Sequence, residues 1–183
     1  MTSTALNRRL STDLDNTFTG FMAEMQGAVF NGARRWLPTR QDAEDVTQEV
    51  FVRAYMALQG YPPEQIAGLR LRPWLFAITL NLCRNQARAR SRRPVQVALG
   101  HTDDAAPDGT EQSAIDGLAV DEWRRRLTRL TGRQRDAIVL RHVVEMSYQE
   151  ISEVLGRPAG TVKSDVHRGL ERLRAIIDSE ELS

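Results

Sequence analysis

Residues 146–177, MSYQEISEVLGRPAGTVKSDVHRGLERLRAII, decide the fold, because they predict two short helices joined by a tight turn. Ser147 followed by Glu150 is the capping-box pattern that begins a helix. Gly156 can take the left-handed conformation that ends a helix, and Pro158 cannot continue it. The second helix has an apolar inner stripe of Val162, Val166, Leu170, Leu173 and Ile177. The pattern therefore predicts a helix-turn-helix.

The outer face of the second predicted helix is polar and basic near its beginning. Its side chains there are Lys163, Ser164, His167, Arg168 and Arg172. In a helix-turn-helix, the N-terminal part of the second helix enters the major groove of DNA. A helical hairpin with a solvated basic face has the same pattern, so this stretch alone leaves both interpretations open.

Charge is distributed in blocks, although the formal net charge of the chain is only +1. Residues 65–102 contain seven arginines and no acid, and residues 103–116 contain five acids and no Lys or Arg. Blocks of opposite sign indicate surfaces with different partners. Lys163 is the only lysine. Arginine suits phosphate and guanine contacts, but a GC-rich genome gives the same bias.

Several classes of function are disfavoured by the composition. The single cysteine, Cys83, excludes an internal disulfide and lies in an apolar helical run, where we expect it to be buried. The three histidines lack the partners of a metal site or catalytic triad, and no Gly-rich phosphate loop occurs. We expect no catalytic residue, no metal and no cofactor. No apolar run approaches membrane-spanning length and no signal-peptide core is present, so we expect a cytoplasmic protein.

The N-terminal half predicts a helical domain over residues 18–93, after a disordered tail over residues 1–17. The helix that begins near Asp42 has a buried apolar stripe. On another face it carries Asp45, Gln48, Glu49 and Val52. Spacing alone predicts that this second face is solvated.

A further long helix begins near Pro73 and changes character along its length. Its first half, from Trp74 to Leu82, is apolar on nearly all sides and must be buried, whereas its second half is basic. Such a helix can be anchored in the core by its first half while its basic end contacts phosphates. Asn81 lies near the change and is either a satisfied core amide or a group that contacts a base.

Residues 94–119 predict a flexible acidic linker, and residues 120–178 predict a second helical domain, with a short tail over 179–183. In the second domain we expect Trp123, Leu127 and Leu130 to face inward. Thr131 and Gln134 form another capping box. No segment alternates with a period of two. The predicted fold is all-α, with two small helical domains.

Three segments in order, DAEDVTQEVFVRAY, RPWLFAITLNLCRNQARARSRR and LTGRQRDAIVLRHVVEMSYQEISEVLGRPAGTVKSDVHRGLERLR, resemble an extracytoplasmic-function (ECF) sigma factor of bacterial RNA polymerase. The resemblance covers nearly the whole chain. It implies that the face bearing Asp45, Gln48, Glu49 and Val52 binds the clamp helices of the polymerase core. It also implies contacts with the minus-ten promoter element, in which Asn81 captures a flipped-out base. The residues implied there are Trp74, Asn81, Arg84, Arg88 and Arg90.

The resemblance assigns the helix-turn-helix to the minus-thirty-five element. The residues implied are Arg157, Thr161, Lys163, Ser164, His167, Arg168 and Arg172, the first two being better placed for phosphates. Asp165 departs from the family pattern, and we expect it to point outward without contacting DNA. The acidic linker would imitate nucleic-acid charge in the polymerase cleft. The partners implied are core polymerase, promoter DNA and an anti-sigma factor.

Two other classes of protein remain as alternatives from sequence. A free-standing helix-turn-helix regulator would form a dimer and bind a palindrome unaided, with half-sites about one helical turn apart. A structural helical adaptor would leave both basic surfaces unexplained.

Overall fold

The computed structural model describes residues 3–92 and 111–182, and every regular element in these two ranges is a helix, as expected. The predicted linker lies largely outside the described residues. The elements are α1 (Ser3–Thr12), α2 (Leu14–Trp36), α3 (Arg40–Gly60), α4 (Pro63–Gly68), α5 (Leu71–Arg92), α6 (Glu111–Thr128), α7 (Gly132–Ile138), the π-helical turn η1 (Val139–Val143), α8 (Tyr148–Leu155) and α9 (Ala159–Glu181).

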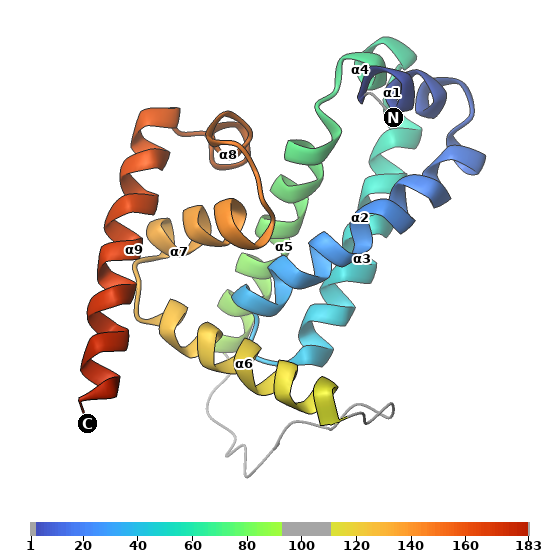
Figure 1. The fold of residues 1–183 in the computed structure, drawn as a ribbon. Coiled ribbons are helices and arrows are strands. Elements are labelled where there is room, and N and C mark those ends of the chain that lie inside the picture. The colour runs from blue at the N-terminus through green and yellow to red at the C-terminus, as the bar shows by residue number, and fades with distance from the viewer. Residues whose placement is uncertain (1–2, 93–110, 183) are drawn as a thin grey trace.

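The N-terminal helices are built around α2, α3 and α5, which pack against one another (Figure 1). Side-chain caps fix the beginnings of the first two: Asp13 accepts a hydrogen bond from the Asn16 amide, and Thr39 from the Asp42 amide. The apolar stripes predicted for α2, α3 and α5 are largely buried, and Phe21 of α2 is one example. The first half of α5 is enclosed on nearly all sides, as its composition requires.

A disordered tail was predicted over residues 1–17, and this is wrong for residues 3–17, because α1 and the start of α2 occupy them. Leu10 is only 1 % exposed, and Leu6 and Leu14 pack against the core at four-residue spacing. Asn7 donates hydrogen bonds to the carbonyls of Ala67 and Leu69, at 3.2 and 2.5 Å, and so ties α1 to the end of α4. These three leucines form a helical stripe that the polar residues around them conceal.

The C-terminal helices contain the helix-turn-helix in α8 and α9. Both predicted capping boxes are present, at Thr131–Gln134 and at Ser147–Glu150, and Gly156 adopts a φ of 61° at the end of α8. Of the stripe predicted for α9, Val162, Val166 and Leu173 are buried, whereas Leu170 and Ile177 are half-buried. Ile176, which was not predicted, is buried beside Ile177. The local rules of helix initiation and termination therefore predict this half of the chain well.

Three boundaries in the C-terminal half differ from expectation. Residues 111–119, assigned to the linker, belong to α6, and the predicted tail over 179–183 is helical to Glu181. Glu180 holds that end by pairing with Arg126 at 2.8 Å and with Arg129 at 3.0 Å. Trp123 does not face inward but is 41 % exposed, with the Arg126 guanidinium lying over its ring at 5.5 Å.

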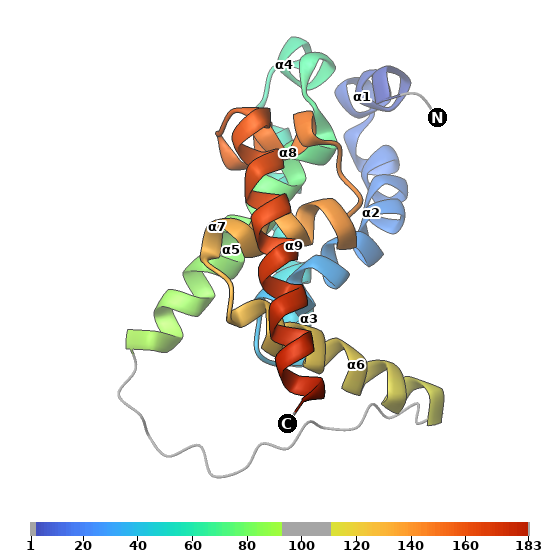
Figure 2. The same cartoon turned by 60° about the vertical axis from the view of Figure 1, so that its left-hand side comes forward.

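The two sets of helices pack directly on each other, although a domain boundary was predicted between them. Helix α5 lies between the N-terminal helices and α8, while α2 contacts η1 and α6 (Figures 1 and 2). A Cβ on Gly32 of α2 would lie 3.4 Å from Val144 and 3.6 Å from Phe76, so these residues meet at the seam. Among the helices of the described residues, none is both long and apolar enough to cross a bilayer.

Gly169 allows the closest approach of α7 and α9. A Cβ at this position would lie 2.5 Å from Ile138 Cδ1 and 3.2 Å from Gln134 Cβ. We therefore expect Gly169→Ala to reduce the free energy of unfolding by about 1–3 kcal/mol through overpacking, measured by urea denaturation.

Gly20→Ala is the matched control, because nothing lies within 4 Å of a Cβ at that exposed position in α2. Alanine there should stabilise the protein by about 0.5–1 kcal/mol through its helix propensity. Equal effects of the two substitutions would disprove the close-packing role of Gly169.

Candidate protein and nucleic-acid interfaces

The predicted polymerase-binding face of α3 is open to solvent. Asp45 and Gln48 are exposed, Glu49 is half-exposed, and Val52 is 53 % exposed. Both carboxylates are engaged by residues of the same helix: Gln41 donates to Asp45 at 2.7 Å, and Arg53 pairs with Glu49 at 2.6 Å. The structure therefore brings the four predicted residues onto one accessible face.

Met56 extends this face by one further turn and was missed in the sequence. It lies four residues after Val52 and is 64 % exposed, so two large apolar side chains follow the acidic ones along α3. Its position at i+4 was the available signal. A face with both carboxylates and exposed apolar groups can bind a protein through charge and through burial of apolar area.

A pocket between α3 and α5 contains two of the predicted minus-ten residues. Tyr61, Trp74, Asn81 and Asn85 line it, and the rings of Tyr61 and Trp74 lie 6.2 Å apart at their centroids. Asn81 is exposed and Trp74 is half-buried. Aromatic surface beside amide groups can stack on a nucleobase and bond its edge. The sequence did not predict Tyr61 or Asn85, because the pocket depends on how α3 and α5 pack.

Two of the predicted phosphate-binding arginines on α5 are engaged in ion pairs. Arg84 Nη2 donates to Asp136 Oδ2 at 2.6 Å, and Arg90 pairs with Asp42. Partial burial opposes the charge of Asp42, but hydrogen bonds from Thr39 and Gln86 and the nearby Arg90 lower the pKa of its carboxyl overall. Arg88 is exposed. In this arrangement Arg84 and Arg90 are held by carboxylates of the same chain.

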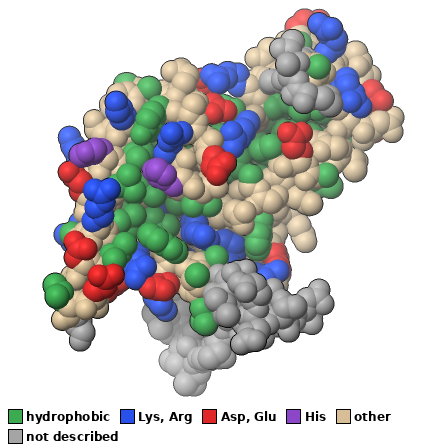
Figure 3. Space-filling model, viewed as in Figure 1, with side chains coloured by type: hydrophobic (Ala, Val, Ile, Leu, Met, Phe, Trp, Pro, Cys, Tyr) green, Lys and Arg blue, Asp and Glu red, His purple; other side chains and the backbone are tan. Residues whose placement is uncertain are grey.

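The outer face of α9 is accessible as predicted. Thr161, Lys163, Ser164, His167, Arg168 and Arg172 are all exposed. Ser164 Oγ donates to the carbonyl of Gly160 at 3.0 Å, and His167 Nδ1 lies 3.5 Å from Glu171. On the face of the molecule drawn in Figure 3, basic side chains are interspersed with acidic ones. The residues of α9 that were predicted to contact DNA therefore lie on an exposed surface at the beginning of the helix.

From the sequence we expected Asp165 to point outward, but it does not. Its carboxylate pairs with Arg157 across the helix turn, and both side chains are largely buried. Ser152 Oγ adds a hydrogen bond to the Arg157 carbonyl at 2.6 Å. The contact joins two elements across the turn, so helical periodicity could not predict it. Arg157, predicted to contact phosphate, is instead neutralised within the turn.

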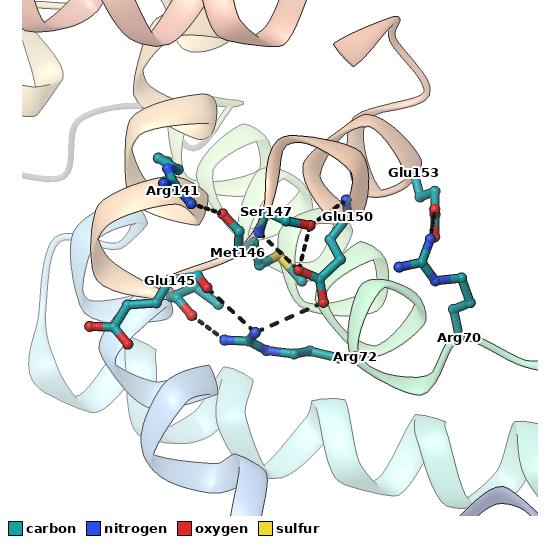
Figure 4. Close-up of polar contacts among 9 residues, drawn as sticks. Arg70, Arg72, Arg141, Glu145, Met146, Ser147, Glu150 and Glu153 are labelled. Carbon is teal, nitrogen blue, oxygen red and sulfur yellow. Dashed lines mark hydrogen bonds and ion pairs between the residues drawn. The ribbon is translucent and has the colours of Figure 1, made fainter. Parts of the chain in front are cut away.

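The seam between the two sets of helices carries a polar cluster (Figure 4). Arg72 of α5 donates to the carbonyl of Val144 and, at 3.5 Å, to that of Glu145, whose φ is 61°. Arg72 also lies 3.9 Å from Glu150, and Arg70 pairs with Glu153. Two arginines of one domain thus hold the loop and the first helix of the helix-turn-helix.

The loop before α8 is also braced from its own side. Arg141 donates to the carbonyl of Met146 at 2.8 Å (Figure 4). Its guanidinium lies 5.0 Å from the centre of the Tyr148 ring. Partial burial opposes the charge of Glu150, but hydrogen bonds from Ser147 and the charge of Arg72 lower the pKa of its carboxyl overall. Glu150 therefore remains ionised and serves both the cap and the seam.

The metal-binding and nucleophilic side chains were considered in the sequence as possible sites of chemistry, and the structure places them as follows. Within residues 3–92 and 111–182, no group of three His, Cys, Asp or Glu residues is placed to hold a metal ion. Cys83 is buried, and this burial together with the charge of Asp136 raises the pKa of its thiol to about 12.

Both halves of the chain match models of known protein families. The family model for Sigma-70 region 2 matches residues 21–93, and that for Sigma-70 region 4 matches residues 121–173. The first match covers α3 and α5 and the second covers the helix-turn-helix. The two regions follow in the order expected from the resemblance.

Individual relatives agree with the family models. The RNA polymerase sigma-E factor of Streptomyces avermitilis is 35 % identical, covering 90 % of this chain and 87 % of its own. The ECF RNA polymerase sigma factor SigW of Bacillus subtilis is 31 % identical, covering 80 % and 81 %. The structure of CnrH in complex with the cytosolic domain of CnrY superposes with a TM-score of 0.73 at 26 % identity, over 97 % of both chains.

These matches support the sigma-factor interpretation and not the free-standing dimeric regulator. Fold, order of regions and sequence identity agree over most of the chain, which therefore belongs to the ECF sigma factors of bacterial RNA polymerase.

Proposed function

We propose that this ECF sigma factor carries out promoter recognition through three separate surfaces: the outer face of α3, the pocket and basic end of α5, and the beginning of α9. The observation that carries the proposal is the exposed basic face of α9 within the segment matched by Sigma-70 region 4. The protein supplies specificity and needs no catalysis of its own, because the polymerase core performs the chemistry. Its place of action is the cytoplasm, with the polymerase.

The α3 face is proposed to bind the clamp helices of the core. Support comes from the accessible carboxylates of Asp45 and Glu49 beside the exposed Val52. Charged residues at such a surface guide association and set register, whereas buried apolar groups add affinity. Met56 belongs to the same proposed contact.

The α5 surface is proposed to hold the opened minus-ten element. A base that leaves the stack costs a few kcal/mol, which stacking and hydrogen bonds in a pocket must offset. Trp74 and Asn81 line one pocket and supply both kinds of contact. Arg84, Arg88 and Arg90 follow on the same helix and would hold the backbone, provided that Arg84 and Arg90 exchange their carboxylate partners for phosphates.

The α9 surface is proposed to contact the minus-thirty-five element. Lys163, Ser164, His167 and Arg168 lie in the first turns, where a recognition helix meets base edges. Thr161 and Arg172 flank them and suit phosphates. Arg157 is the weakest member of the set, because it must leave Asp165 before it can reach DNA.

An anti-sigma factor is a further proposed partner. The structure of CnrH, whose match extends over nearly the whole of this chain, also contains the cytosolic domain of CnrY. An inhibitory partner of this kind would act by covering one or more of the three surfaces.

The test of the function is transcription with purified components. The protein is added to core polymerase on genomic DNA, and the transcript starts are sequenced. Starts downstream of one shared pair of promoter elements, absent without the protein, would support the proposal. Palindrome binding by a dimer of the chain alone, with no effect on core enzyme, would overturn it.

The α3 surface predicts an effect of charge reversal on core binding. Glu49→Lys should weaken the affinity for core polymerase about tenfold, measured by biolayer interferometry, because it removes a steering charge from the contact. Glu24→Lys is the control, since Glu24 is an exposed carboxylate on α2, outside the proposed contact. If the two variants bind core equally well, the outer face of α3 is only solvated.

The α9 surface predicts a loss of promoter specificity without a loss of core binding. Lys163→Ala or Arg168→Ala should each reduce promoter-specific transcription about five- to 100-fold, as expected for one good base contact. Arg125→Ala removes an exposed charge from α6, outside the proposed surface of α9, and should have little effect. A fall in core affinity in either test variant would show that these residues do something else.

The α5 pocket predicts slower promoter opening when Asn81 is truncated. Asn81→Ala should reduce the equilibrium for open-complex formation about two- to tenfold, because a hydrogen bond to the base edge is lost. Permanganate footprinting measures the opening, and Gln59→Ala, an exposed amide on α3, is the control. Opening at the wild-type level by Asn81→Ala would exclude base capture by this residue.

A further inference from the structure

A carboxylate lies at the edge of the α9 surface that is proposed to contact the minus-thirty-five element. Asp165 directly follows Ser164 and precedes Arg168 by three residues. Side chains three residues apart on a helix are neighbours, and an acid and a base at this spacing attract each other. Asp165 is therefore placed to pair with Arg168, an arginine proposed to contact a base edge.

The turn of the helix-turn-helix provides another partner for this carboxylate. Arg157 of the turn pairs with Asp165, and the two side chains are only 18 % and 15 % exposed. Arg168 is exposed, and within residues 3–92 and 111–182 it makes no ion pair. Water and salt screen a partly buried pair less than a pair on the surface, so Asp165 favours Arg157 over Arg168.

Backbone contacts hold the turn at Arg157 independently of this ion pair. Gly156 ends α8 with a φ of 61°, and the amide of Arg157 donates to the carbonyl of Ser152 at 3.1 Å. Ser152 Oγ in turn donates to the carbonyl of Arg157 at 2.6 Å. Both hydrogen bonds use backbone atoms of residue 157, so a change of its side chain leaves them in place. The pairing with Asp165 is therefore a separate contribution of the guanidinium.

We propose that Arg157 is a positioning residue for base recognition: it holds Asp165 away from Arg168, and so leaves the Arg168 guanidinium free for the minus-thirty-five element. The proposal rests on the assignment of Arg168 to that element made above. In this role Arg157 stays on Asp165 and does not contact phosphate. It also cancels a negative charge that would otherwise repel the DNA backbone.

The test measures base discrimination by the complete holoenzyme. Transcription by core polymerase with each full-length variant is compared, at one salt concentration, between the wild-type promoter and versions with one base pair of the minus-thirty-five element replaced. Arg168→Ala identifies the base pair that Arg168 contacts, because discrimination falls at that position. The ratio of the two rates cancels any effect that weakens DNA binding uniformly, including repulsion of phosphates by an unpaired Asp165.

Removal of the Arg157 side chain should relax discrimination at that same base pair. Arg157→Ala releases Asp165 to pair with Arg168, and the ratio should fall about two- to fivefold, the effect of one exposed ion pair. Addition of Asp165→Asn to this variant should restore the ratio, because no carboxylate remains to occupy Arg168. In a chain that already carries Arg168→Ala, Arg157→Ala should cause no further fall.

Arg129→Ala is the matched control. It also removes an arginine and breaks an ion pair of the C-terminal helices, that with Glu180, but lies outside the proposed surface of α9. The ratio should remain at the wild-type value. Circular dichroism checks that each variant is folded, and Arg157→Gln, which keeps most of the aliphatic stem, replaces Arg157→Ala if the latter is not.

A wild-type ratio in the folded Arg157 variant would overturn the proposal. A fall that Asp165→Asn does not restore would overturn it too, and would assign Arg157 to a phosphate contact or to support of the turn. Failure of the proposed function itself would be seen earlier and differently, as an absence of promoter-specific transcripts when the wild-type chain is added to core.

Discussion

The need to cover the first half of α5 is the constraint on which the rest of the structure depends. This half is apolar on nearly every side, so one neighbouring helix cannot shield it. Helices α2 and α3 cover it from one direction, and α8 covers it from the other. Leu75 and Phe76 are consequently inaccessible to solvent. The basic second half of the same helix then projects from a rigid base, as a surface for a polyanion must.

Local chemistry made much of the fold predictable. Ser147 with Glu150 and Gly156 with its positive φ mark helix ends in the sequence as clearly as in the structure. The exposed residues of α9 were likewise predictable, because the buried stripe fixes the opposite face. Residues 1–17 were misjudged for a related reason: Leu6, Leu10 and Leu14 are too sparse among polar residues to stand out, yet four-residue spacing suffices for a helix that packs on α4.

The unpredicted features all depend on contacts between distant segments. Arg84 and Asp136 are 52 residues apart, and Arg72 and Val144 are 72 apart, so no local pattern connects them. Asp165 is unusual in a recognition helix, and its ion pair with Arg157 explains its presence there. A charged residue that contradicts a binding surface is often explained by a partner within the chain. The roles of individual residues toward DNA and polymerase rest on the family resemblance and on exposure.

The buried position of Cys83 has a consequence for the sensitivity of this protein to oxidants. Oxidants attack thiolates, and a buried thiol with a pKa near 12 is almost entirely neutral at physiological pH. The chain has no second cysteine with which a disulfide could form internally. Peroxide and disulfide reagents should therefore react slowly with this thiol, and only when local unfolding exposes it.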